Sequence, residues 1–135
     1  MDPESHQITA VDLGYYENEK QIDVLVYDHD DHFELKTTID GIDLEAQADD
    51  LFSAFQTLRD KLLGSGYGIK CNGAKINALQ SGMMRNTDAV YLVELGRRAE
   101  KKDVHGLWDL CEMEGYANTE EQERFAQEWR NSLIK

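Results

Sequence analysis

Residues 22–39 read IDVLVYDHDDHFELKTTI, two alternating runs on either side of an acidic turn. Apolar or β-branched residues recur at every second position, at 22, 24 and 26 in the first run and at 33, 35, 37 and 39 in the second. Because successive side chains of a strand point to opposite faces, this period predicts two strands with one apolar face. Residues 28–31 (DHDD) readily bond their own backbone and supply the turn. The stretch therefore predicts an antiparallel hairpin whose apolar face the rest of the chain must cover.

An amphipathic helix is predicted directly after this hairpin, over residues 44–62. Its apolar residues recur at spacings of three and four, which places them on one stripe of a helix: Leu44, Ala48, Leu51, Phe52, Phe55, Leu58 and Leu62. Asp43 is the expected N-cap, and the Gly-Ser-Gly of residues 64–66 ends the helix. We expect this helix to lie on the apolar face of the hairpin.

Shorter patterns predict β-structure in three further segments of the chain. Residues 7–14 predict a first strand that stops at a glycine. Asn-Gly within residues 67–76 predicts a second hairpin, because both residue types tolerate positive φ. Residues 89–95 (AVYLVEL) are the most β-prone run in the chain and predict a central strand.

A final helix is expected to begin at Thr119, with Gln122 three residues later completing a capping box. Its apolar face comprises Phe125, Ala126, Trp129 and Leu133. The predicted order is βββ-α-βββ-α. The predicted fold class is α+β: a single domain over residues 1–135, with a mostly antiparallel sheet of about six strands and two main helices packed on it.

Negative charge is concentrated in the first part of the chain. Residues 1–60 contain 16 Asp and Glu against 3 Lys and Arg, whereas residues 61–135 contain 11 of each, so the formal net charge of −13 comes from the first 60 residues. Nucleic acids and anionic membranes bind through Lys and Arg, and an acidic surface repels them. Such a surface attracts basic proteins and speeds their association. The expected partner is therefore a basic protein, and we do not expect the chain to bind nucleic acid or a membrane.

Length and cysteine usage indicate the type of protein. A chain of 135 residues can bury a core without metals or disulfides. No apolar run approaches the roughly 18–20 residues that span a bilayer, and the acidic start at residues 1–4 lacks the apolar region of a secretory signal. Cys71 and Cys111 predict two free thiols in a reducing compartment. The expected location is the cytoplasm.

Two groups of residues raise the question of catalysis or metal binding. Asp and His in the turn 28–32 are suitable metal ligands, but the spacing lacks the central glycine and final glutamate of a calcium loop. Cys71 would need a neighbouring base and a cleft to act as a nucleophile, and its apolar setting favours a small buried hydrophobe. The sequence has no GxSxG, HExxH, P-loop or dinucleotide fingerprint. We therefore predict no catalytic residue, no metal and no cofactor, and do not expect an enzyme; whether the Asp/His turn binds a metal stays open.

Three short motifs carry a resemblance to a known family. They are Cys71-Asn72-Gly73-Ala74-Lys75, Ser81-Gly82-Met83-x-Arg85 and Ala89-x-Tyr91-Leu92-x-x-Leu95-Gly96. Together they resemble a family of small bacterial cytosolic proteins with the pattern Cys-Asn-Gly-small-basic, Pro-Ser-Gly-Met and a strand ending in Leu-Gly. The chain departs from this pattern in having Gln80 in place of the proline and in lacking a Gly-rich segment before the last strand. The resemblance implies no enzymatic activity. In character, the chain is also similar to immunity proteins of contact-dependent or secreted bacterial toxins.

The leading hypothesis is an immunity protein that neutralises a basic bacterial toxin of nuclease type by covering its positively charged site. The expected partner-binding residues lie on the hairpin turn, at the start of the first helix and, for one basic contact, in the later loop: Asp28, Asp30, Asp31, Glu34, Asp43, Glu45, Asp49, Asp50 and Arg85. The alternative is a small enzyme or ligand-binding domain that uses the loop at residues 71–86, with Cys71, Ser81, Arg85 and His105. A third hypothesis is a structural or regulatory module whose acidity serves only solubility.

Overall fold

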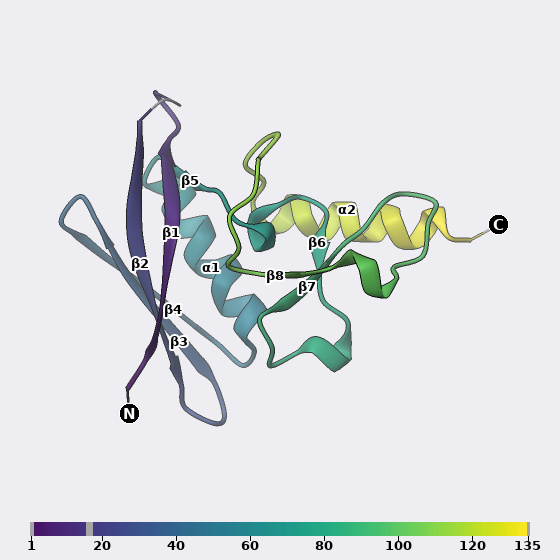
Figure 1. The fold of residues 1–135 in the computed structure, drawn as a ribbon, viewed down its shortest axis with the longest axis horizontal. Helices are drawn as coiled ribbons and strands as arrows, with labels where there is room; N and C mark the ends of the chain where they lie inside the picture. The colour runs from purple at the N-terminus through teal and green to yellow at the C-terminus, as the bar shows by residue number, and fades with distance from the viewer. Residues whose placement is uncertain (1, 16–17, 135) are drawn as a thin grey trace.

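Four consecutive antiparallel strands form the first part of the protein, as the computed structural model in Figure 1 shows. The structure describes residues 2–15 and 18–134. The four strands are β1 (Glu4–Asp12), β2 (Glu19–Asp28), β3 (Phe33–Ile39) and β4 (Ile42–Ala48). A short fifth strand, β5 (Tyr67–Ile69), pairs with the other side of β1, so the sheet formed by the described residues has the order β4-β3-β2-β1-β5. The predicted α+β domain with a mostly antiparallel sheet is confirmed.

The hairpin predicted from residues 22–39 is confirmed and supplies much of the core. Val26 of β2 lies opposite Leu35 of β3, and both are buried. Their face of the sheet is covered by helix α1 (Leu51–Gly64), which buries Phe55 and Leu58 against it. Removing this apolar surface from water is the main driving force for the fold.

Residues 42–48 form strand β4, so the prediction of a helix from residue 44 is wrong. Asp40 and Gly41 both have positive φ, 52° and 76°, and make a two-residue hairpin turn, for which Asp-Gly is a favourable sequence. Leu44 and Ala48 are four residues apart, a spacing that fits both the period of a strand and that of a helix. Pairing with β3 decides between the two.

The first helix accordingly begins at Leu51, and its N-cap is Asp50 rather than the predicted Asp43. The Asp50 carboxylate accepts a hydrogen bond from the Ser53 N–H at 2.8 Å, which satisfies one of the free backbone donors of the first turn. The helix ends in the predicted Gly-Ser-Gly segment, where Gly66 has a φ of 93°.

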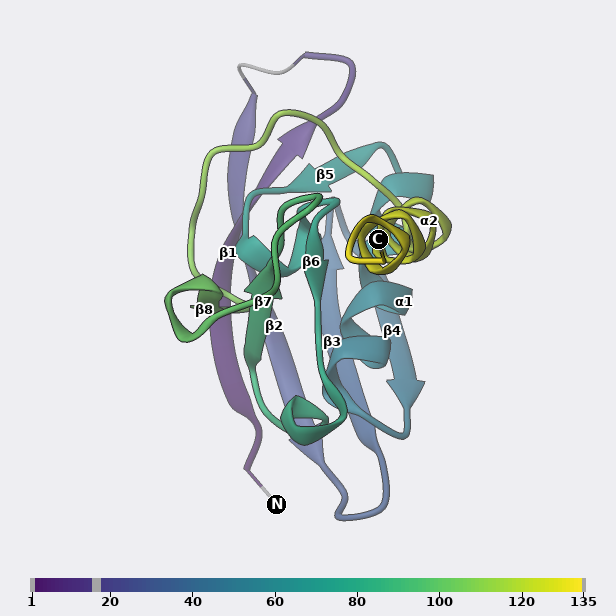
Figure 2. The same ribbon diagram turned by 90° about the vertical axis from the view of Figure 1, so that its right-hand side faces the viewer.

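A second, small sheet follows on the same side of the first sheet as α1 (Figures 1 and 2). Its strands and intervening 3₁₀ turns are η1 (Asn72–Ala74), β6 (Ala78–Leu79), η2 (Gly82–Met84), β7 (Ala89–Leu92), η3 (Lys101–Asp103) and β8 (Val104–Gly106). Within the described residues the strand order is β6-β7-β8, so the β-prone run at 89–95 supplies the middle strand of this sheet. The strands of the described chain divide between a five-stranded and a three-stranded sheet, whereas the sequence predicts one sheet of about six strands.

Asn72-Gly73 forms η1 and not the predicted hairpin turn. Gly73 does not have a positive φ; it is required because the chain is tightly packed there. A Cβ atom on Gly73 would lie 2.7 Å from the side chain of Leu107 and 3.1 Å from the ring of Phe55. The Gly73 N–H also donates to the Leu107 carbonyl at 2.9 Å.

The second helix, α2 (Thr119–Ser132), packs against α1 and β6 and not, as predicted, on the five-stranded sheet. Its N-cap is Asn118, one residue before the predicted Thr119. The capping box pairs Asn118 with Glu121, because the Asn118 side chain accepts from the Glu121 N–H and the Glu121 carboxylate accepts from the Asn118 N–H.

Gln122, predicted as the capping partner, is instead a buried link between the two halves of the fold. Its side-chain oxygen accepts from Arg59 of α1 at 2.6 Å. Its amide nitrogen donates to the carbonyls of Gly73 at 2.9 Å and Lys75 at 2.7 Å. Helix α2 is thereby fixed to α1 and to the segment that leads into the second sheet.

Candidate functional site

The predicted partner-binding carboxylates lie at one end and on one face of the five-stranded sheet. The turn after β2 and the turn between β4 and α1 share that end, because Asp28 pairs with Phe33 and Phe33 with Ala48. The carboxylates on β3 and β4 alternate with buried residues and therefore face away from α1. The end carries Asp28, Asp30, Asp31, Asp49 and Asp50, and the face carries Glu34, Asp43 and Glu45.

Few of these carboxylates are neutralised within the protein. Asp28 Oδ1 accepts a hydrogen bond from the Asp30 N–H at 2.9 Å, which shapes the turn and leaves both charges in place. Glu34 accepts from His29 at 3.2 Å, and this hydrogen bond lowers the Glu34 pKa. Apart from Glu34, which lies 3.9 Å from Lys36, none of the eight predicted carboxylates forms an ion pair with a described lysine or arginine.

Two of the predicted residues, Asp28 and Asp30, line a cavity of about 460 Å³. Its other acidic residues come from the start of the chain and from the loop before β7, and the full set of carboxylates is Asp2, Glu4, Asp28, Asp30 and Asp88. We call this cavity the acidic cleft. None of the described residues that line it is a lysine or an arginine, and its one described histidine, His6, lies 3.4 Å from Glu4.

The floor of the acidic cleft is apolar. Val26, Phe33, Leu51 and Trp108 line it, and all four are buried. The ring of His6 stacks on Trp108 with a centroid distance of 4.7 Å and fixes that side of the cleft. An apolar floor below a ring of carboxylates fits a side chain with an aliphatic stem and a cationic head, which is the chemistry of lysine and arginine.

The hairpin turn itself is arranged by internal contacts. Asp30 adopts a φ of 72°, which Asp tolerates better than most residues. His32 lies 2.6 Å from Asp31, an interaction that lowers the Asp31 pKa, and the rings of His29 and His32 stack at 4.6 Å. In residues 2–15 and 18–134 no group of three or more His, Cys, Asp or Glu side chains is placed to hold a metal ion.

Arg85, the predicted basic contact, is exposed after η2 and is not part of the acidic cleft. It lines a separate cavity of about 290 Å³ together with Ser81, Asp50 and Arg130. The lining of that cavity includes neither Cys71 nor His105. Of the four residues considered for an enzyme at 71–86, the structure thus brings Ser81 and Arg85 to this cavity but not Cys71 and His105.

Cys71 is completely buried, and burial raises the pKa of its thiol to about 12. A thiol with so high a pKa stays protonated at neutral pH and is a poor nucleophile. Cys71 forms a β-bridge with Leu110, which places Cys111 one residue along the facing segment. Both cysteines are free thiols in the structure.

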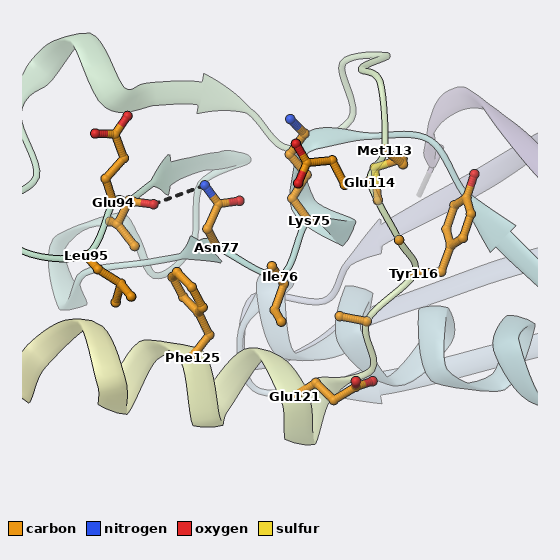
Figure 3. Close-up of a pocket in the computed structure, with 13 residues that line it drawn as sticks. Lys75, Ile76, Asn77, Glu94, Leu95, Met113, Glu114, Tyr116, Glu121 and Phe125 are labelled. Carbon is orange, nitrogen blue, oxygen red and sulfur yellow. Dashed lines mark hydrogen bonds between the residues drawn. The ribbon is translucent and has the colours of Figure 1, made fainter.

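Another hollow, which we call the apolar groove, lies between α2, the segments at 75–77 and 93–95, and the loop at 113–117 (Figure 3). Its volume is about 630 Å³. The sequence does not predict this groove, because the β-prone run ending at Leu95 indicates core packing, whereas Leu95 is 53 % exposed. The sequence likewise gives no sign that Asp88 lines the same cavity as Glu4 and His6 of β1, since that depends on how the two sheets pack.

No protein family model matches the chain, and no curated protein is significantly similar to it in sequence. Neither helix of the described residues is long and apolar enough to span a bilayer. The resemblance to the small bacterial family and to immunity proteins therefore stays a prediction.

Proposed function

We propose that this protein is an acidic binding protein, an immunity protein that neutralises a basic bacterial toxin of nuclease type by covering its positively charged site. The acidic cleft carries the proposal, because it combines carboxylates from separate parts of the chain with an apolar floor and has no lysine or arginine among its described lining residues. The proposed location is the cytoplasm, where such a toxin would act.

The cleft would bind a lysine or arginine side chain of the toxin. The aliphatic stem would lie on Leu51 and Trp108, and the cationic head would meet Asp28, Asp30 and Asp88. A nuclease uses its cationic side chains to hold nucleic acid phosphates. When the cleft binds one of these side chains and its neighbouring carboxylates cover the others, nucleic acid can no longer bind to the active site of the toxin.

The carboxylates outside the cleft have a different role in this proposal. Asp31 and Asp49 are exposed near the same end of the sheet, and Asp43 and Glu45 are exposed on its outer face. Exposed charges contribute little to final affinity but accelerate the encounter of oppositely charged proteins. They would steer the basic toxin towards the cleft.

The test uses the protein encoded by the adjacent reading frame, in which we expect a basic toxin domain at the C-terminus. That domain is purified, and its nuclease activity is measured with increasing amounts of this protein. We expect inhibition that reaches completion at a one-to-one ratio. Activity that is unchanged at excess would refute the proposal.

A matched pair of variants locates the site. Asp28→Asn/Asp30→Asn/Asp88→Asn removes three charges from the cleft while keeping the side-chain shapes, and Asn can still accept the turn hydrogen bond at position 28. Glu120→Gln/Glu123→Gln/Glu128→Gln removes three charges from exposed positions of α2. The cleft variant should bind at least about tenfold more weakly, and the helix variant less than about threefold. Equal losses would mean that only net charge matters and that the cleft is not the site.

A further inference from the structure

The apolar groove exposes large hydrophobic side chains that no element of the protein covers in the described chain. Ile76 is 44 % exposed and Leu95 is 53 % exposed, and partly buried Phe125 of α2 lies between them. Figure 3 shows these three side chains along one side of α2, with Met113 and Tyr116 at the far end of the groove. Scattered exposed hydrophobic residues are ordinary, but a row of them in a hollow of this size marks a binding surface.

Hydrogen bonds at both ends hold the groove open. At one end Gln122 of α2 donates to the Lys75 carbonyl at 2.7 Å. At the other end the Trp129 indole donates to the Arg97 carbonyl at 2.9 Å, and the Gly96 N–H donates to Ser132 Oγ at 2.7 Å. Because α2 is fixed at two separated points, it cannot move onto Ile76 and Leu95 to bury them.

The charges around the groove are mostly negative. Glu94, Glu114 and Glu121 line it, against the single lysine Lys75. Glu94 accepts a hydrogen bond from Arg97 at 3.2 Å, and Glu121 accepts one from the Asn118 N–H at 3.0 Å. The Glu121 bond comes from a neutral amide and not from a lysine or an arginine. A cationic segment with apolar residues complements this surface in both respects.

We propose that the apolar groove docks a short amphipathic, basic segment of the partner protein, with apolar side chains on Ile76, Leu95 and Phe125 and lysine or arginine near Glu114 and Glu121. This inference rests on the proposed function for the identity of the partner. A second copy of this chain is disfavoured as the occupant, because each copy has a formal net charge of −13 and the two would repel. The groove would supply apolar contacts with the partner, in addition to the mainly electrostatic contacts of the acidic cleft.

The two sites differ in their response to salt. Binding at the acidic cleft weakens as salt screens the charges. Binding in the groove buries apolar surface, and this contribution persists at high salt and gives a negative heat-capacity change. The groove can therefore be tested apart from the cleft.

The probe is a synthetic 14-residue peptide of leucine and lysine in a heptad pattern, titrated by calorimetry and by NMR at high salt. The control peptide has serine in place of every leucine. We expect the leucine peptide to bind with a negative heat-capacity change and to shift the amide signals of Ile76, Leu95 and Phe125, and the serine peptide not to bind. Equal binding of the two peptides would overturn the proposal.

Variants complete the test. Ile76→Ala/Leu95→Ala truncates exposed side chains of the groove and should weaken leucine-peptide binding about tenfold or more. Met83→Ala/Leu110→Ala truncates side chains that are 96 % and 71 % exposed elsewhere and should leave it unchanged. Equal affinity of the groove variant and the unaltered protein would refute the proposal that the peptide binds in the apolar groove. If the leucine peptide binds in the groove as expected but the adjacent toxin domain does not bind, the proposed function is refuted, whereas the proposal that the groove docks an amphipathic basic segment is supported.

Discussion

Gln122→Ala is predicted to destabilise the domain by about 3–5 kcal/mol. The Gln122 side chain is 2 % exposed, accepts hydrogen bonds from Gln56 and Arg59, and donates to the carbonyls of Gly73 and Lys75. Truncation leaves both carbonyls without this donor. A buried polar group that stays without a hydrogen-bond partner lowers the free energy of unfolding by about 1–3 kcal/mol. It also removes the neutral acceptor of a buried cation, and a hydrogen bond to a charged group is worth about 1.5–3 kcal/mol.

Arg59 has few other acceptors to replace the lost Gln122 oxygen, since its remaining side-chain partners are Asp60 and Thr119 among the described residues. It is also 2 % exposed, and burial lowers the pKa of its guanidinium while Asp60 partly opposes that effect. Its Nη1 atom already has no hydrogen-bond partner among the described residues. We take the whole effect to lie within the sum of these losses and not above it, because neighbouring groups and water relax into the space.

The assay is equilibrium unfolding in urea, followed by far-UV circular dichroism and tryptophan fluorescence. Gln127→Ala is the matched control: it lies on the same helix, is exposed, and should change the free energy of unfolding by less than about 0.5 kcal/mol. A change below about 1 kcal/mol for Gln122→Ala, with an unaltered urea slope, would refute the reasoning.

A double variant tests the cause. Arg59→Met/Gln122→Leu removes the buried charge together with its acceptor. It should be less destabilised than the sum of the two single variants, with a coupling of about 1 kcal/mol or more. Strict additivity would show that the two side chains do not act as a unit.

Three further outcomes are expected. Asp30→Lys/Asp31→Lys should slow association with the basic partner and reduce its salt dependence without unfolding the domain, since turn residues bear little packing, although Lys tolerates the φ of 72° at position 30 less well than Asp; stopped-flow rates at several salt concentrations measure this, and an unchanged rate would place the contact elsewhere. Phe55→Ala should lower the free energy of unfolding by about 3–5 kcal/mol, because the ring is buried between Trp108 and Phe52, and urea unfolding measures it. The Arg97 guanidinium lowers the Asp103 pKa to about 2 from an ordinary value of 3.8, so the stabilisation from this carboxylate is complete above about pH 4 and is lost as pH falls through about 2; the stability difference between the protein and Asp103→Asn should shrink over that range, and a constant difference would contradict the assignment.

Local patterns in the sequence predicted the elements that are decided by neighbouring residues. The alternation at 22–39 predicted the β2–β3 hairpin because strand periodicity and turn chemistry act within a few residues. The apolar stripe from Leu51 to Leu62 predicted α1 for the same reason. The prediction of this helix was wrong at its start, because Asp40-Gly41 forms a further hairpin turn and residues 42–48 pair with β3 as a strand.

Tertiary structure decided everything that depends on distant segments meeting. Asn72-Gly73 has the composition of a hairpin turn, but the approach of Leu107 and Phe55 makes it a buried 3₁₀ turn. The charge count predicted an acidic partner-binding surface, including Asp28 and Asp30, yet the addition of Asp88 and the apolar floor to those residues requires the second sheet to pack against the first. The sequence alone determined hydrophobic periods and net charge, because both are sums over nearby residues; the cleft and the groove are spaces between segments far apart in the chain, and only packing creates them.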